Sequence, residues 1–163
     1  LPPGPTTGVV LNVLLRKTDA PYEVIDSIKS VLSNTGSTNF YFSNATNNTD
    51  FYIVVKHKNS IETWSSQPVR FNFGQAAYNF TDSATRAYGN NLIFRSGKYC
   101  VYSGDVNQDG VIDATDFGFV DNSVFNFTTG IVTEDLNGDF LVDAFDLSIV
   151  DNNSFSFVGV IRP

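Results

Sequence analysis

Apolar residues in the first part of the chain come in short runs that suit β-strands. Residues 8–16 form an apolar run rich in β-branched side chains, and residues 50–57 hold five consecutive aromatic or β-branched residues. Such side chains favour the extended backbone of a pleated sheet. We therefore predict strands over 8–16 and 50–57. Weaker runs of the same kind predict three further strands, over 37–42, 68–73 and 91–95.

Residues 22–33 carry two competing patterns. Their apolar positions follow helical spacing, whereas their β-branched content and the neighbouring runs favour two short strands, which we predict. One short helix is predicted from Asp82, a suitable N-cap, to Tyr88. Turn-forming residues separate the apolar runs at 34–36, 44–48 and 89–91. Short strands with this spacing predict a β-sandwich domain over residues 8–102.

The pattern changes after residue 102, where a twelve-residue spacing of Asp and Asn occurs twice, 30 residues apart. The two copies occupy residues 105–116 and 135–146. Both place oxygen-bearing side chains at positions one, three, five, nine and twelve. These are the positions from which an EF-hand-type loop surrounds Ca²⁺, with a backbone carbonyl at position seven. The sequence therefore predicts two structural Ca²⁺ ions.

The predicted ligands follow from these positions. In the first loop they are the side chains of Asp105, Asn107, Asp109 and Asp116, the carbonyl of Val111, and Asp113 directly or through water. In the second loop they are the side chains of Asp135, Asn137, Asp139 and Asp146, the carbonyl of Leu141, and Asp143. Gly110 supplies the freedom of the mid-loop turn in the first copy. Phe140 stands at that position in the second copy, where Gly138 lies two residues earlier.

The two copies also agree beyond the loops, since residues 105–127 and 135–157 are identical at 11 of 23 positions. A calcium loop followed by one helix, duplicated, resembles the bacterial dockerin domain over residues 103–160. The resemblance implies a calcium-dependent fold and a cohesin-like partner, bound through polar residues near the loop ends. Those positions hold Ala114 and Thr115 in the first copy and Ala144 and Phe145 in the second, which is not a matched polar pair.

The first part of the chain has a resemblance of its own. Residues 51–64 look like part of the prealbumin-like sandwich domains of bacterial surface proteins. No Pro/Gly-rich linker separates the two parts, so we expect them to pack as one rigid unit. The predicted fold is mainly β with a small α part. It comprises an extended arm over 1–7, a β-sandwich over 8–102 and a dockerin-like calcium-binding domain over 103–163.

Charge and composition narrow the classes of partner. The net charge of −7 divides into +3 over residues 1–99 and −10 over residues 100–163, and no basic patch predicts a nucleic-acid partner. No run approaches the ~20 apolar residues of a membrane span. The single cysteine, Cys100, lies in an apolar run and is expected to be buried. Because the chain contains no Met, we expect a mature secreted product that is located outside the cell or on its surface.

The sequence predicts no enzyme. The one histidine, His57, ends a predicted strand between two lysines, and the chain has no Gly-x-Ser-x-Gly elbow, Gly-rich phosphate loop or zinc spacing. Trp64 and the tyrosines raise the alternative of a carbohydrate-binding module. Five sequons provide candidates for N-glycosylation, at Asn44, Asn47, Asn79, Asn126 and Asn152.

The N-terminus favours a structural role. A proline-rich arm that cannot join a helix or a central strand precedes the first predicted strand. It comprises Leu1, Pro2, Pro3, Gly4 and Pro5 and runs to residue 7. Such an arm could add to the sheet of a neighbouring molecule, and repeated head-to-tail contacts of this kind give open filaments. We therefore predict a subunit of an extracellular filament or surface assembly, with a dockerin-type adaptor for a cohesin-like partner as the alternative.

Overall fold

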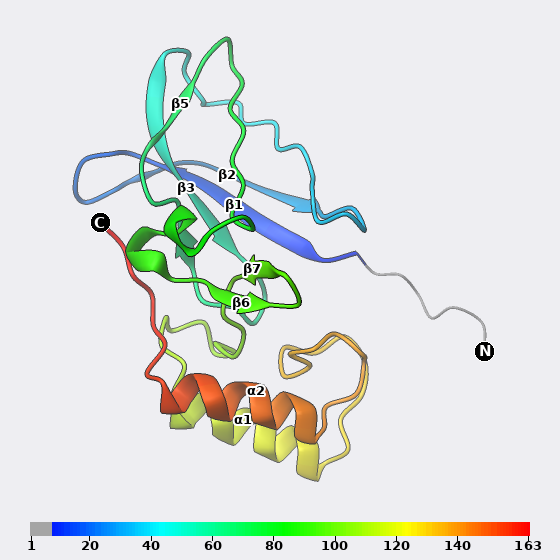
Figure 1. Ribbon diagram of the computed structural model, residues 1–163. Helices are drawn as coiled ribbons and strands as arrows, with labels where there is room; N and C mark the ends of the chain where they lie inside the picture. Colours follow the sequence, from blue (N-terminus) through cyan, green and yellow to red (C-terminus); the bar gives the residue numbers. More distant parts are fainter. Residues whose placement is uncertain (1–7) are drawn as a thin grey trace.

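A computed structural model describes residues 8–163 and places an antiparallel sheet above a pair of helices (Figure 1). Four strands lie in the order β2 (Val24–Val31), β1 (Val10–Arg16), β3 (Thr49–Lys56) and β4 (Thr63–Trp64). β4 pairs with the end of β3, and a fifth strand, β5 (Val69–Phe71), pairs with its beginning. The long central strand β3 therefore joins three neighbours.

Both faces of this sheet are covered. Val13, Leu14 and Leu15 are consecutive in β1 and all buried. Because neighbouring strand residues point to opposite faces, this pattern requires cover on both sides. One face packs the cluster of Leu14, Tyr52, Val54 and Trp64 against Tyr22, Tyr88 and Val160. The other packs Leu15, Phe51 and Phe71 against Ile25, Phe42, Ala45 and Ile53.

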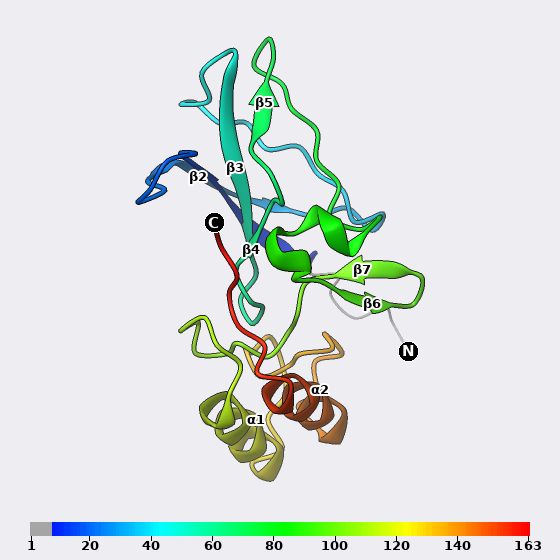
Figure 2. The same ribbon diagram turned by 60° about the vertical axis from the view of Figure 1, so that its left-hand side comes forward.

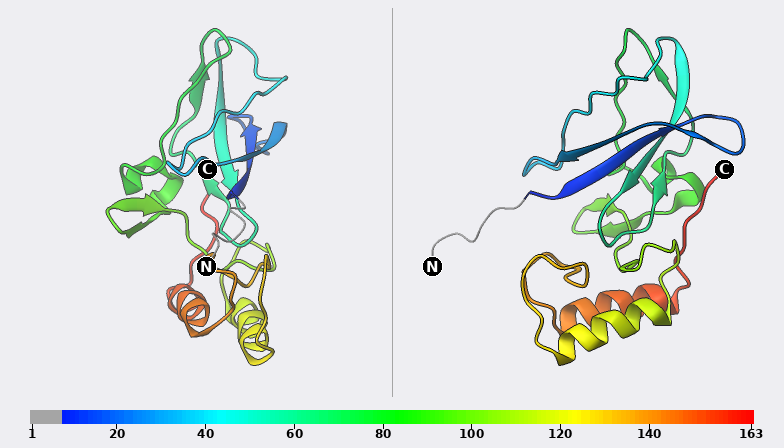
Figure 3. Two further views of the ribbon diagram at one scale, coloured as in Figure 1. Left: turned by 90° about the vertical axis from the view of Figure 1, so that its right-hand side faces the viewer. Right: turned by 180° about the vertical axis from the view of Figure 1, so that it is seen from behind.

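The predicted packing of two sheets into a sandwich is not confirmed. In the described residues the second sheet is a ribbon of two short strands, β6 (Ile93–Arg95) and β7 (Lys98–Cys100), which lies to one side of the main sheet (Figure 3). Irregular chain around Phe42 covers one face of the main sheet instead, and Tyr88, from a short 3₁₀ turn, contributes to the cover of the other. Cys100 at the end of β7 is exposed, so the prediction that it is buried is wrong.

Most predicted strands are present, but two predictions are wrong. Residues 37–42 form no strand, although Phe42 packs onto a face of the sheet and the hydroxyl groups of Ser30 and Thr38 form a hydrogen bond. Residues 22–33 hold one strand, β2, rather than two. It pairs with β1 along its whole length and passes one irregularity opposite Leu15 and Arg16.

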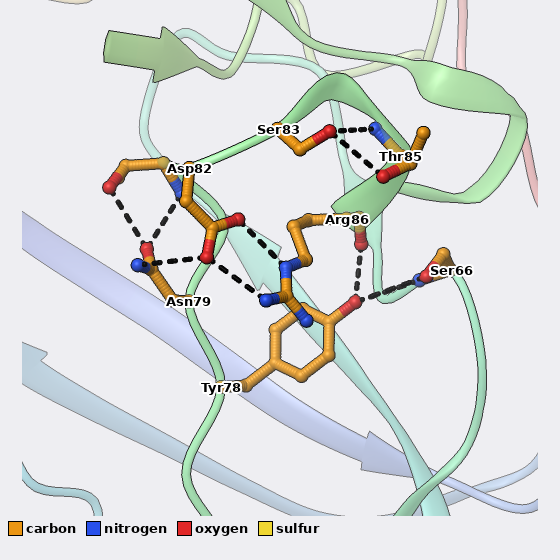
Figure 4. A network of polar contacts seen from close by, with 8 residues as sticks. Ser66, Tyr78, Asn79, Asp82, Ser83, Thr85 and Arg86 are labelled. Carbon is orange, nitrogen blue, oxygen red and sulfur yellow. Dashed lines mark hydrogen bonds and ion pairs between the residues drawn. The ribbon is translucent and has the colours of Figure 1, made fainter.

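The helix predicted over 82–88 is replaced by two short 3₁₀ turns, η1 (Ala84–Arg86) and η2 (Tyr88–Asn90). Ser83, not Asp82, caps the first turn, since its hydroxyl accepts from the N–H of Thr85. Asp82 instead receives two bonds from the Arg86 guanidinium, which lowers the pKa of that carboxyl (Figure 4). The Tyr78 hydroxyl links this segment to Ser66, at the end of β4.

Two helices of equal length form the C-terminal part, α1 (Ala114–Phe125) and α2 (Ala144–Phe155), and lie side by side (Figure 2). Asp113 and Asp143 cap them, and each helix has a complete capping box closed by Asp116 or Asp146. Among the described residues, no helix is long and apolar enough to cross a membrane.

The two parts exchange core residues. Ile61, from the turn between β3 and β4, is fully buried in the helical core with Val106, Ile112, Val120, Val142, Val150 and Val158. In the opposite direction, the C-terminal tail returns from α2 to the sheet (Figure 1), where Val160 packs on the cluster around Trp64. The predicted arm, residues 1–7, lies outside the described residues.

Candidate calcium-binding site

Each Asp/Asn-rich loop is closed by its last carboxylate. In the first loop, Asp116 is fully buried and its Oδ1 accepts from the backbone N of Val106 at 2.9 Å and of Asn107 at 3.3 Å. Its Oδ2 accepts from the N of Asp113 at 3.0 Å. Position twelve therefore holds positions two, three and nine together.

The second loop repeats this geometry. Asp146 is also fully buried, and its Oδ1 accepts from the N of Leu136 at 2.8 Å and of Asn137 at 3.0 Å. Its Oδ2 accepts from the N of Asp143 at 3.0 Å. The match extends the sequence repeat to the hydrogen bonds, although Phe140 replaces the mid-loop glycine.

Positions three and five are oriented by short side-chain-to-backbone bonds. Asn107 Oδ1 accepts from the N of Asp109 at 2.8 Å, and Asp109 Oδ1 accepts from the N of Val111 at 3.0 Å. The second loop has the same two bonds, from Asp139 N to Asn137 Oδ1 at 2.8 Å and from Leu141 N to Asp139 Oδ1 at 2.9 Å. Turns of this kind bring successive oxygens to the same side of a loop.

Position nine has a second task in both loops. Asp113 Oδ1 accepts from the N of Thr115 at 2.7 Å, and Asp143 Oδ1 accepts from the N of Phe145 at 2.8 Å. The bond from Thr115 lowers the pKa of Asp113 and keeps that carboxylate charged. Each position-nine residue is thus both a helix cap and a candidate ligand.

Position one distinguishes the loops. Asp135 accepts from three backbone N–H groups, of Gly138, Asp139 and Phe140. By contrast, Asp105 is 2% exposed and its Oδ1 accepts no hydrogen bond within the described part of the chain. Burial, together with the nearby charges of Asp116 and Asp109, raises the pKa of Asp105 to about 6.

An unpartnered buried carboxylate oxygen is costly unless a cation compensates it. The candidate ligand oxygens of the first loop therefore fit a hard cation such as Ca²⁺, which prefers oxygen ligands. Within residues 8–163, no three His, Cys, Asp or Glu side chains form a ready-made metal cluster. Ca²⁺ in either loop would therefore also need the oxygens of Asn107 or Asn137 and the carbonyl at position seven. The ligand set stays a prediction.

The remaining candidates lie apart from the loops. Trp64 is 1% exposed and its Nε1 donates to Glu62, so it has no free face on which a sugar could stack. His57 is half-buried, and burial lowers its pKa. All five sequon asparagines are exposed: Asn44, Asn47, Asn79, Asn126 and Asn152. Their glycosylation stays a prediction.

Sequence reasoning missed the contacts that the loops make with the sheet. Gln108, at position four of the first loop, donates from Nε2 to the carbonyl of Ser60. Asn59 donates from its side chain to the second loop. No spacing in the sequence marks Asn59, because its partners lie more than 70 residues away.

Comparison with known families agrees with this geometry. Residues 103–153 match the dockerin type I domain. Dockerin type I domains bind calcium, are non-catalytic modules, and occur in extracellular or cell-surface proteins. The match spans less than a third of the chain. Searches of curated proteins and of solved structures find no match.

Proposed function

We propose that this chain is a calcium-stabilised, non-catalytic docking protein whose helical part binds a cohesin-type protein partner. The match of residues 103–153 to the dockerin type I domain carries the proposal. The congruent hydrogen bonds of the two loops support it, because they extend the repeat to backbone geometry. Two Ca²⁺ ions would have a structural role, neutralising carboxylates that are buried at positions one and twelve.

The surface of the helical part supports a protein partner. Large apolar side chains are exposed at the ends of both helices: Phe125 at 81%, Phe127 at 84%, Phe155 at 85% and Phe157 at 88%. Phe145, at a loop end, is 73% exposed. Aromatic residues are enriched in protein interfaces relative to the rest of the surface, so these five are candidates for the docking contact. We refer to these five residues as the exposed phenylalanines.

Charge indicates what the partner must offer. Residues 100–163 carry a formal charge of −10, which two Ca²⁺ would reduce to −6. A partner with an apolar centre and a basic rim would complement this surface, and such complementarity mainly raises the association rate. The loop ends hold Ala114, Thr115, Ala144 and Phe145, all exposed. We therefore expect the docking contact to depend on apolar packing more than on a matched polar pair.

The alternatives from the sequence have less support. The filament subunit was predicted from an arm that lies outside the described residues, and it stays a prediction. The carbohydrate-binding alternative relied on Trp64 and the tyrosines, and Trp64 is buried in the core. Secretion fits the occurrence of dockerin modules in extracellular and cell-surface proteins and stays part of the proposal.

The test is binding to a panel of purified cohesin domains in millimolar Ca²⁺. At least one cohesin should bind, and Phe145→Ala combined with Phe155→Ala should weaken that binding at least about tenfold, as expected for buried aromatic anchors. Phe73→Ala is the matched control, because Phe73 is 92% exposed but lies just after β5. A panel in which no cohesin binds the folded, calcium-loaded chain would contradict the proposal.

A further inference from the structure

The turn between β3 and β4 enters the helical part and reaches both calcium loops. We propose that Asn59 in this turn is a positioning residue that holds the second loop in its calcium-binding form. Asn59 lies outside the matched segment 103–153. The inference rests on calcium binding by the loops and is independent of any protein partner.

Asn59 is 2% exposed, and both donor hydrogens of its side-chain amide are used in hydrogen bonds. Its Nδ2 donates to the carbonyl of Thr133 at 2.9 Å and to the carbonyl of Asp135 at 3.0 Å. Its Oδ1 lies 2.9 Å from Nδ1 of His57, which fixes the amide in place. Lys58 adds a bond from its ammonium to the carbonyl of Val132. Asn59 thus fixes the backbone at position one of the second loop.

The same turn holds the first loop, but through its backbone. The carbonyl of Asn59 accepts from the N of Gly104 at 2.7 Å, directly before position one of that loop. Gln108 Nε2 donates hydrogen bonds to the carbonyls of Ser60 and Asp105, at 3.3 Å and 2.6 Å. Since these bonds use no side-chain atom of Asn59, they survive a substitution there. Loss of the side chain should therefore affect the second loop selectively.

The turn is rigid enough for this role. Ile61 is fully buried in the helical core, and its N donates to the carbonyl of Tyr102 at 3.0 Å. Asn59 is therefore held between a buried anchor and the end of β3. Groups that orient metal ligands without touching the metal commonly change its affinity 10- to 100-fold when removed.

Calcium titration of single-loop variants tests the proposal. Asp109→Ala leaves the second loop intact, and Asp139→Ala leaves the first. Adding Asn59→Ala should weaken calcium binding at least about tenfold in the Asp109→Ala chain and by no more than about twofold in the Asp139→Ala chain. Isothermal titration calorimetry measures both, with circular dichroism in saturating Ca²⁺ to establish folding. Equal weakening in both chains, or none in either, overturns the proposal.

Asn91→Ala is the matched control. Asn91 is a second buried asparagine between the two parts, at 8% exposure, but its Nδ2 donates to Gly159 in the C-terminal tail at 2.9 Å. Its loss should change the calcium affinity of the Asp109→Ala chain by no more than about twofold. An effect as large as that of Asn59→Ala would assign the change to general loosening between the parts and overturn the proposal.

If Asn59→Ala does not fold, amide hydrogen exchange tests the proposal in two chains that keep Asn59, the unsubstituted chain and Asp139→Ala. Coupling between a ligand and a contact is reciprocal, so calcium in the second loop should stabilise the turn that holds it. Saturating Ca²⁺ should slow exchange of the Gly104 and Ile61 amides more in the unsubstituted chain than in Asp139→Ala. Equal exchange in the two chains overturns the proposal. Neither experiment contains a cohesin, so both are independent of the proposed function.

Discussion

At the scale of single residues, both Asp/Asn-rich loops have a left-handed backbone at the same two places. Position four has a φ of +60° at Gln108 and +82° at Gly138, and position six has +95° at Gly110 and +70° at Phe140. Each loop therefore places glycine at one of the two positions and a strained residue at the other. The ligand spacing was predictable from the sequence, as was the shift of the loop glycine from position six in the first copy to position four, at Gly138, in the second. That both positions adopt a positive φ in both loops was visible only in the backbone angles.

This geometry predicts opposite effects for two glycine substitutions. Gly138→Ala should lower the free energy of unfolding by about 1 kcal/mol in saturating Ca²⁺, because alanine is disfavoured at positive φ. Gly118→Ala is the control, since Gly118 lies inside α1 with no atom within 4 Å of an added Cβ. It should raise the free energy of unfolding by roughly 0.5–1 kcal/mol. Urea denaturation measures both, and a stabilising Gly138→Ala would contradict the strain argument.

At the scale of elements, apolar runs predicted the strands whose side chains fill the core. β1 and β3 lie within one residue or two of the predicted bounds because both faces of each are buried. The prediction failed over 37–42, where Phe42 contributes to the core from irregular chain. It also failed near Asp82, whose carboxylate pairs with Arg86 instead of capping a helix. Periodicity reports burial, and burial does not require regular structure.

The helices should depend on calcium more than the strands do. Asp116 and Asp146 are fully buried in the first turns of α1 and α2, and each closes a loop with several other carboxylates. Without Ca²⁺ their repulsion opposes the fold, since binding to such a site is coupled to folding. Addition of EGTA should remove much of the helical far-UV circular dichroism signal. Asp109→Ala and Asp139→Ala should each lower the calcium stoichiometry. An unchanged spectrum in EGTA would contradict this account of the two helices.

At the scale of the whole molecule, the sheet and the helical pair meet at an interface, here called the joint, to which each part contributes residues that pack in the core of the other. Ile61 enters the helical core, and Val160 returns to the sheet. The sequence indicated this only by lacking a linker, because neither residue belongs to a recognisable motif. The five exposed phenylalanines all belong to the helical part, and Phe157 among them lies next to the C-terminal tail that returns to the sheet. The two Asp/Asn-rich loops belong to the part of the molecule that we propose docks, and the turn at Asn59 contacts both of them.

The most direct test of the central claim is calorimetric titration of the full chain with a cohesin domain selected from the panel, in Ca²⁺, after EGTA, and after Ca²⁺ is restored. The proposed function predicts saturable binding in Ca²⁺, loss of binding in EGTA, and recovery when Ca²⁺ returns. Binding of equal strength with and without Ca²⁺ would contradict it, because the docking surface would then not depend on the calcium loops.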